Sequence, residues 1–209
     1  MQEALLFSME QDYRIVCGLD EAGRGPLAGP VVAAAVILGP DFPTHLLNDS
    51  KKLSEKQRLE AEKVIKEKAL FWAIGLATAQ EIDRINILQA SLLAMQRAYE
   101  KISRKIQVDL AFVDGNQRPN LDCITQTIVG GDALVPQIMA ASILAKNQRD
   151  RYMVQSHAKW PYYNFAKHKG YPTAEHREAC LLYGLSPIHR RSFHIEQKPT
   201  STKKQATLF

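Results

Sequence analysis

The pattern of hydrophobic and polar positions along the chain predicts five strands. Residues 14–19 alternate between the two kinds of position, which predicts a strand that ends at Asp20. A continuous apolar run at 31–38 lies between a proline and a Gly-Pro pair and predicts a second, buried strand. The three other segments of this kind are residues 71–78, 110–113 and 124–129.

Four segments show the periodicity of helices. The charged amphipathic stretch at 54–69 begins with a capping-box pattern, in which Ser54 is followed by Gln57. Apolar side chains at helical spacing over 80–104 predict a long helix that is broken near Asn86. The two other helices are predicted at residues 137–157 and 173–183.

This order of elements predicts an α/β fold with a mixed sheet and flanking helices, because three closely linked strands precede a helix-separated pair. A chain of 209 residues, 45% hydrophobic and 23% charged, is enough for one domain with its own core. We expect that domain to span residues 1–196. The polar, lysine-bearing segment 197–209 is expected to be a flexible tail.

Three features bear on where the protein works. The longest clean apolar run, at 31–38, is far too short to cross a bilayer. Glu3 stands where a signal peptide carries positive charge. Cys17, Cys123 and Cys180 lie far apart without a Cys-x-x-Cys pair, so neither a zinc site nor a disulfide framework is indicated. We expect a monomer in the reducing cytoplasm, with no membrane segment.

The positive charge is concentrated at one end of the chain. The net charge is +5, and residues 186–209 contribute +4 of it, from five basic residues and one acidic residue. A nearly neutral body with a basic end favours an anionic partner, and nucleic acid is the natural candidate. Arg190 and Arg191 are expected to bind phosphates, and the alternative is that one of them stabilises the fold.

Four acidic residues lie at the ends of predicted strands. Asp20 and Glu21 follow the first, Asp114 the fourth, and Asp132 lies just beyond the fifth. If these strands are neighbours, their carboxylates meet, and divalent cations relieve the repulsion between them. Mg²⁺ or Mn²⁺ fits such oxygen ligands, and a pair of these ions is the usual apparatus for attack on a phosphodiester. Taken singly, each acid is better explained as a turn residue, and alternation along a strand points Asp20 and Glu21 to opposite faces.

Gly23, Arg24 and Gly25 follow the first acids directly. Glycines at these positions permit a positive φ and close approach to a ligand, and Arg24 can bind a phosphate. The same three residues also form an ordinary turn in many proteins.

Other residues suit contacts with nucleic acid. Lys51, Ser142 and Lys146 are candidates for the phosphate backbone, although Ser142 also fits a close helix contact among alanines. Tyr171 lies on a constrained turn between a glycine and a proline, and is a candidate stacking platform for a base or sugar. The six histidines show no convincing metal-ligand spacing, so no histidine metal site is expected.

Six motifs in order resemble bacterial ribonuclease HII. They are DEAGRGPLAGPVVAAAV (20–36), NDSKKLS (48–54), VDGNQRP (113–119), AASILAK followed by RDR (140–151), HKGYPTAEH (168–176) and HRRSF (189–193). Each is short, but their common order and spacing make the resemblance specific over residues 14–193.

The resemblance implies a ribonuclease-H-like fold: a mixed five-stranded sheet with flanking helices and a helical C-terminal part that helps to hold the substrate. It implies that residues 23–25 read the ribose 2′-hydroxyl and that Tyr171 stacks at the RNA–DNA junction. Asp150 is taken as structural. Asn147-Gln148 departs from the Val-Thr usual in the family and is expected to tune contacts with the nucleic-acid backbone. The metal ligands that it implies are Asp20, Glu21, Asp114 and Asp132.

The activity implied is hydrolysis of the RNA strand of RNA–DNA hybrids, and cleavage 5′ to single ribonucleotides embedded in DNA. Two Mg²⁺ or Mn²⁺ ions would activate water and stabilise the leaving oxygen, which leaves 3′-hydroxyl and 5′-phosphate ends. A non-catalytic hybrid-binding protein is a weaker alternative, because all four acids are present. The type 3 enzyme carries an extra N-terminal domain, for which a first acid at position 20 leaves no room.

The chain ends in Gln205-Ala206-Thr207-Leu208-Phe209. The pattern Gln-x-x-Leu-Phe resembles the peptide by which bacterial repair proteins dock on the sliding clamp. Leu208 and Phe209 would fill an apolar pocket, and Gln205 would make the orienting hydrogen bond. The alternative is a frayed tail without function.

Overall fold

The computed structural model describes residues 13–48, 50 and 52–194, and in this part of the chain five strands form one mixed sheet. The sheet order is β3-β2-β1-β4-β5. β1, β2 and β3 are antiparallel neighbours, whereas β1, β4 and β5 run parallel. The mixed five-stranded sheet predicted from the sequence is confirmed. The strands are β1 (Val16–Ala22), β2 (Val31–Ile37), β3 (Phe71–Ala77), β4 (Leu110–Asp114) and β5 (Ile124–Ile128).

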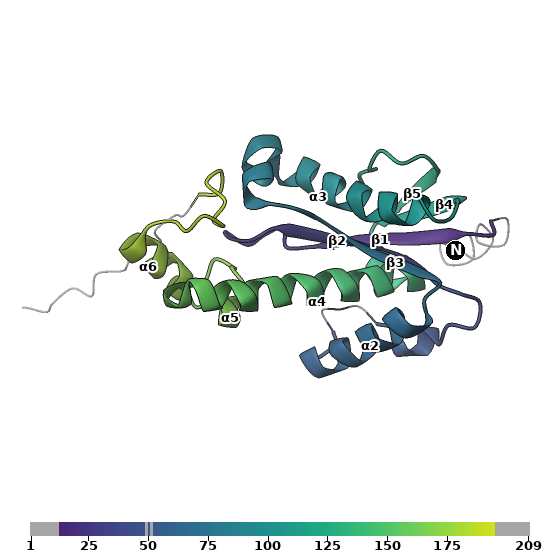
Figure 1. Ribbon diagram of the computed structural model, residues 1–209, viewed down its shortest axis with the longest axis horizontal. Helices are drawn as coiled ribbons and strands as arrows, with labels where there is room; N and C mark the ends of the chain where they lie inside the picture. Colours follow the sequence, from purple (N-terminus) through teal and green to yellow (C-terminus); the bar gives the residue numbers. More distant parts are fainter. Residues whose placement is uncertain (1–12, 49, 51, 195–209) are drawn as a thin grey trace, which may run out of the picture.

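Helices cover both faces of the sheet. Figure 1 shows α3 on one face, α4 and α2 on the other, and α5 and α6 at the end of the molecule to which α4 leads. Three short 3-10 turns and α5 were not predicted from the sequence. The helices are α2 (Glu55–Lys68), α3 (Ala79–Ser103), α4 (Pro136–Lys159), α5 (Phe165–His168) and α6 (Ala174–Tyr183), and the 3-10 turns are η1 (Thr44–Leu46), η2 (Gly131–Ala133) and η3 (Pro161–Tyr163).

Local sequence signals explain where the helices begin and break. The capping box predicted at Ser54 and Gln57 is present at the start of α2. The break predicted in the long helix lies at Asn86, whose φ is +66°. The Asn86 side chain accepts the backbone N–H of Gln89 at 3.1 Å, so it caps the second segment of α3.

Strand β1 is longer than the sequence predicted. We expected it to end at Asp20, but it continues to Ala22 because β2 pairs with it as far as Ala22 and Val32. Asp20 and Glu21 therefore lie on rigid sheet backbone and not in a loop. Nearer the start of β1, Gly18 faces α4. A Cβ on Gly18 would come within 2.2 Å of the Gln137 backbone, so glycine lets α4 lie directly on β1.

The apolar core has one layer on each side of the sheet. The layer under α3 includes Leu19, Ala33 and Met95, and the layer under α2 and α4 includes Ala34 and Ile143. Among the described helices, none combines the length and apolar composition needed to cross a membrane. The site residues on β1 and α4 are thus anchored in two well-packed layers.

Candidate active site

The acidic residues lie where β1 and β4 separate. The two parallel strands pair as far as Leu19 and Val113, so Asp20 and Asp114 follow side by side at the next position. The backbone N–H of Gly131 donates to Asp114 Oδ1 at 2.8 Å, which holds η2 against β4. η2 carries Asp132, whose side chain is buried. Asp20, Glu21 and Asp114 lie close enough for their charges to act on one another. That the four acids together bind metal stays a prediction.

Asp20 and Glu21 occupy different surroundings. Asp20 is 4% exposed, and its strand neighbour Ala34 belongs to the layer that faces α4. The Glu21 side chain leaves β1 on the opposite face of the sheet, because successive side chains of a strand point to opposite faces. Its carboxylate pairs with Arg24 at 3.3 Å. Its backbone N–H donates to Asp20 Oδ1 at 2.6 Å.

Burial and like charge shift the ionisation of both carboxyls. Burial raises the pKa of Asp20 well above its usual value, and the charges of Glu21 and Asp114 add to the effect. Burial also raises the pKa of Glu21, where Asp114 acts in the same direction and Arg24 opposes it. A cation placed among these carboxyl groups would stabilise their charged forms and so lower their pKa values. The site is therefore electrostatically suited to a divalent ion.

Ser142 takes a different place from the one expected. It is buried on α4, and its hydroxyl hydrogen-bonds to the Asp20 carboxylate and lowers the pKa of that group. Its Oγ lies 2.8 Å from the Oγ of Ser50, which is also buried. The expected contact of Ser142 with a phosphate is wrong, because the hydroxyl points into the protein. Ser50 was missed, although it stands in the motif at 48–54.

The loop that follows β1 presents the Gly23-Arg24-Gly25 sequence at the surface. Gly23 has a φ of +99°, as the sequence predicted, and a Cβ there would lie 2.0 Å from Arg149 Nε. Gly25 does not have a positive φ. A Cβ on Gly25 would meet only the Tyr171 ring, at 3.9 Å, which places that ring beside the loop. Arg24 and Gly25 are exposed.

Two buried arginines lie beneath this loop. Arg190 donates to the carbonyl oxygens of Gly23, Arg24 and Gly29, at 2.5, 2.8 and 3.0 Å. Its side chain is 1% exposed, so the expectation that Arg190 binds a phosphate is wrong. Arg149 donates to the carbonyls of Pro30 and Ala28. Sequence reasoning gave Arg149 no role, although it follows Ser142 by seven residues and therefore lies on the same face of α4.

Tyr171 is 43% exposed and lies over Arg149, whose guanidinium carbon is 5.8 Å from the ring centre. The turn that carries Tyr171 is fixed to the loop, because the Leu27 N–H donates to the Gly170 carbonyl at 2.8 Å. The predicted constrained turn is present. An exposed aromatic face beside the glycine loop can stack on a base or sugar.

The remaining candidates on α4 take part in ion pairs and hydrogen bonds between helices. Lys146 pairs with Asp150 at 2.8 Å, and Asp150 also faces Arg58 of α2 at 3.8 Å, in agreement with a structural role for Asp150. Asn147 is buried and donates to Arg58 O and to Glu62 Oε2. The expectation that Asn147 tunes contacts with the nucleic-acid backbone is therefore wrong, because its amide joins α4 to α2.

Other predicted residues are exposed or lie outside the described part of the chain. Arg191 is exposed, and its backbone N–H donates to Asp83 Oδ2 at 3.0 Å, so its side chain remains at the surface. Lys51 and the tail residues Gln205, Leu208 and Phe209 lie outside the described residues.

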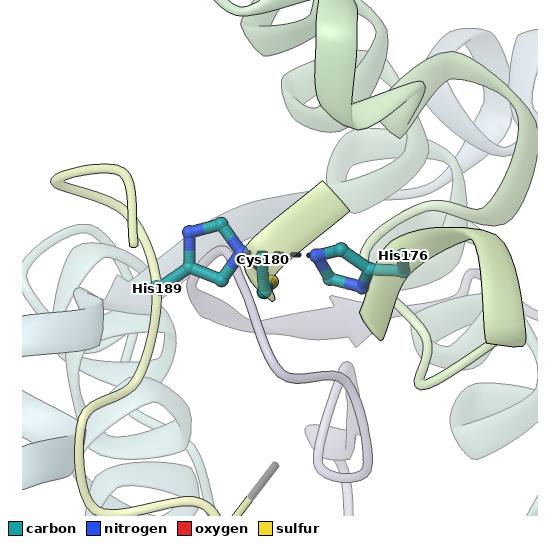
Figure 2. A group of neighbouring side chains, drawn as sticks. All are labelled: His176, Cys180 and His189. Carbon is teal, nitrogen blue, oxygen red and sulfur yellow. Dashed lines mark hydrogen bonds between the residues drawn. The ribbon is translucent and has the colours of Figure 1, made fainter. Parts of the chain in front are cut away.

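A buried group of three side chains, His176, Cys180 and His189, lies on α6 and on the segment that follows it. Within the described chain its ligand-type atoms lie within 4.8 Å of one another, and Figure 2 shows the three side chains converging. The sequence signal that we missed is the spacing of His176 and Cys180, one helical turn apart. His189 comes from the segment that follows α6.

Hydrogen bonds explain this cluster without a metal ion. His189 Nδ1 accepts the backbone N–H of Ser186 at 2.9 Å, so the neutral ring carries its proton on Nε2. His176 Nδ1 donates to the Tyr171 carbonyl at 2.9 Å, which leaves its Nε2 as an acceptor. His189 Nε2–H donates to that atom across 3.0 Å. A metal on both Nε2 atoms would force the His189 proton onto Nδ1, against the Ser186 N–H.

Comparison with known proteins identifies the family. The family model described as Ribonuclease HII matches residues 17–196. The chain belongs to the ribonuclease HII family. Ribonuclease HII of Dechloromonas aromatica (strain RCB) is 56% identical over 179 residues, which cover 86% of this chain and 90% of that protein. Ribonuclease HII of Nitrosomonas europaea is 56% identical over 183 residues, which cover 88% and 84%.

Solved structures have the same ribonuclease-H-like fold. Ribonuclease H2 from Pyrococcus horikoshii OT3 matches with a TM-score of 0.69 and 26% identity, covering 87% of this chain and 95% of that one. The ribonuclease HII in a PCNA complex from Archaeoglobus fulgidus gives 0.72 at 22% identity, covering 88% and 98%. Bst-RNase HIII in complex with Mn²⁺ gives 0.69 at 17% identity, covering 87% and 67%. The last two matches concern the fold alone.

The family establishes the activity. As a member of this family, the chain is a metal-dependent endonuclease that cleaves RNA in RNA–DNA hybrids and cleaves at ribonucleotides embedded in DNA. The expected recognition, fold and enzyme class are confirmed.

Proposed function

We propose that Asp20, Glu21, Asp114 and Asp132 hold two divalent ions, Mg²⁺ or Mn²⁺, in the active complex. The observation that carries this proposal is the position of Asp20 and Asp114, side by side where β1 and β4 separate. The raised pKa of Asp20 under burial and like charge supports it, because carboxylates in that state favour a bound cation. The likeness to Bst-RNase HIII, solved with Mn²⁺, supports the kind of ion.

The donor set fits hard cations. All four side chains offer carboxylate oxygens, which Mg²⁺ and Mn²⁺ prefer to nitrogen or sulfur. When bound, such ions supply the charge that activates the attacking water and stabilises the leaving 3′-oxygen. The chain itself contributes rigid placement, since Asp20 and Asp114 lie on paired sheet backbone and Gly131 fixes the Asp114 carboxylate.

The groups beside the acids select the substrate. In this proposal residues 23–25 read the 2′-hydroxyl and Tyr171 stacks at the RNA–DNA junction. The Arg24 side chain is 54% exposed and directed by Glu21, so it can reach a phosphate. Lys51, Lys146 and Arg191 contact the phosphate backbone. The cleaved bond lies 5′ to the ribonucleotide, and the products carry 3′-hydroxyl and 5′-phosphate ends.

Product mapping tests this assignment. A duplex with one ribonucleotide and a continuous RNA–DNA hybrid are each treated with Mg²⁺ and then with Mn²⁺, and the product ends are identified by mass. We expect cleavage 5′ to the ribonucleotide, and loss of cleavage in Asp114→Asn. Cleavage on the 3′ side would overturn the proposed geometry. Activity of Asp114→Asn above about a tenth of wild type would overturn the two-ion proposal.

We also propose that Gln205, Leu208 and Phe209 dock the enzyme on the sliding clamp. The match to the ribonuclease HII of a PCNA complex supports a clamp as the kind of partner. A cytoplasmic setting is supported by Cys17, Cys123 and Cys180, which are free thiols.

Deletion of residues 205–209 tests the docking. We expect the full chain to bind the cognate bacterial clamp with about micromolar affinity, because a short peptide loses entropy on binding. The truncated protein should lose clamp binding and keep its rate on a short duplex. Unchanged clamp binding after the deletion would contradict the proposal.

A further inference from the structure

The loop of residues 23–30 is held from below by two arginines that bind its carbonyl oxygens. We propose that Arg190 and Arg149 are positioning residues, which orient the peptide planes of this loop so that the backbone N–H groups of Arg24 and Gly25 face the ribose. The inference rests on the proposed function of residues 23–25 in reading the 2′-hydroxyl. In this proposal two backbone N–H groups recognise the 2′-hydroxyl, and buried side chains set the direction in which these groups point.

Arg190 fixes two successive peptide planes. Its Nη2 and Nη1 atoms draw the carbonyl oxygens of Gly23 and Arg24 inward, at 2.5 and 2.8 Å. In a trans peptide the carbonyl and the following N–H point in opposite directions, and the described chain has no cis peptide bond. The N–H groups of Arg24 and Gly25 are therefore directed away from Arg190, toward the exposed side of the loop.

Arg149 holds the returning half of the loop and the aromatic platform. It donates to Pro30 O at 3.2 Å and to Ala28 O at 3.1 Å, and it lies under the Tyr171 ring. Gly23 must lack a Cβ for Arg149 to pass beneath it, since that atom would meet Nε at 2.0 Å. One guanidinium thus sets the loop and Tyr171 at a fixed separation.

The buried charges of Arg149 and Arg190 indicate that these side chains do more than fill space in the core. Both arginines are 1% exposed, and their described partners in these bonds are carbonyls and not carboxylates. Burial lowers the pKa of Arg190 to about 9, and the like charge of Arg149 contributes. Arg149 Nη1 is buried without a hydrogen-bond partner. Burying two cations costs more free energy than filling the same space with apolar side chains. Their planar guanidinium groups also orient the carbonyl groups of the loop, which a lysine ammonium cannot do.

Binding without metal separates positioning from stability. Arg190→Lys and Arg149→Lys are compared with wild type in EDTA, using two duplexes that differ only in one ribonucleotide against one deoxynucleotide. The matched control is Arg97→Lys, since Arg97 also donates to a backbone carbonyl, that of Leu76 at 2.8 Å, in the contact between α3 and β3. The readouts are the ratio of the two dissociation constants and the melting temperature.

We expect wild type and Arg97→Lys to bind the ribonucleotide duplex more tightly. Arg190→Lys and Arg149→Lys should lose that preference by about threefold to tenfold, the value of one or two hydrogen bonds, while their affinity for all-DNA duplex stays unchanged. A purely structural role would lower both affinities together and leave the ratio intact.

Two results would overturn the proposal, and they are distinguishable. If wild type shows no preference, the reading of the 2′-hydroxyl by this loop is wrong and the proposal falls with it. If wild type shows the preference and both lysine variants keep it, the loop reads the sugar without these arginines. Arg149→Lys decides alone if Arg190→Lys does not fold.

Discussion

The hydroxyl of Ser142 and the carboxylate of Asp20 form a hydrogen bond that joins α4 to β1. Ser50 lies on the other side of that hydroxyl, at 2.8 Å. The three groups form a short, buried chain that runs from Ser50 through Ser142 to Asp20. A carboxylate held in this way keeps one orientation before any ion arrives, which lowers the cost of binding.

Ser142→Ala should therefore weaken metal binding without unfolding the protein. We expect the affinity for Mn²⁺, measured by calorimetry without substrate, to fall roughly threefold to tenfold, because one hydrogen bond to a charged group is lost. Ser91→Ala is the matched control. Ser91 is equally buried, but its hydroxyl has no hydrogen-bond partner. Equal Mn²⁺ affinities in the two variants would contradict the role given to Ser142.

Asp20→Asn should abolish cleavage and raise the melting temperature in metal-free buffer. The folded-state pKa of Asp20 is raised, so its contribution to stability is present at low pH and is lost as the pH rises through that pKa. An uncharged amide removes this cost, and we expect a rise of roughly 2–5 °C near neutral pH. Asp150→Asn should instead lower the melting temperature, because it breaks pairs with Lys146 and Arg58. A fall in both variants would show that Asp20 is not under strain from like charge.

Tyr171→Ala should reduce cleavage at single ribonucleotides by more than it reduces thermal stability. Stacking on one base contributes about 1–3 kcal/mol, so kcat/KM should fall by roughly tenfold to a hundredfold, and Tyr171→Phe should keep most of it. Tyr162→Ala provides the comparison, since Tyr162 is 49% exposed but packs against Tyr183 near α6. Similar losses in the two alanine variants would indicate that Tyr171 acts through packing alone.

His176 and His189 should remain neutral until strongly acidic pH. Burial lowers the pKa of each ring to about 4, whereas an unfolded chain binds the proton near 6.5. Their contribution to stability is therefore complete above about pH 6.5 and is lost as the pH falls toward 4, by up to about 1.4 kcal/mol per pH unit for each ring.

Nitrogen-15 NMR of the histidine rings checks both the ionisation and the tautomers. We expect the proton on Nδ1 of His176 and on Nε2 of His189 at neutral pH, as their hydrogen bonds require. Zn²⁺ added to the folded protein should leave both Nε2 resonances in place. Protonation of either ring near pH 6, or a Zn²⁺-induced shift of both Nε2 signals, would contradict the hydrogen-bonded arrangement.

Sequence periodicity was sufficient for the sheet and the long helices. The break at Asn86 and the cap at Ser54 were predictable because each depends on residues within one helical turn. The extent of β1 was not, since it depends on pairing with β2, and neither was the burial of Arg190. A basic residue in the basic C-terminal part of the chain is expected at the surface. Arg190 is buried only because residues 188–190 pair with the backbone around Ala28.

The positions of the acids at strand ends could be predicted because strand ends are visible in the sequence, whereas the groups that contact the acids could not. Ser50 and Ser142 are far apart in the chain, and serine is common in both loops and helices. Their meeting at Asp20 depends on the way α4 crosses β1 at Gly18. Tertiary contacts of this kind leave no local pattern.

Between Ser142 and Arg149, α4 is a single uninterrupted helix. The two residues are roughly two turns apart, about 10 Å along the axis. Ser142 contacts Asp20, and Arg149 supports the loop of residues 23–30. In the function proposed above, this rigid helix therefore fixes the distance between the bond that is cleaved and the hydroxyl that is recognised. Inserting or deleting one residue in this interval would turn one end by about 100° against the other, so the enzyme's register on its substrate is set by the length of a helix.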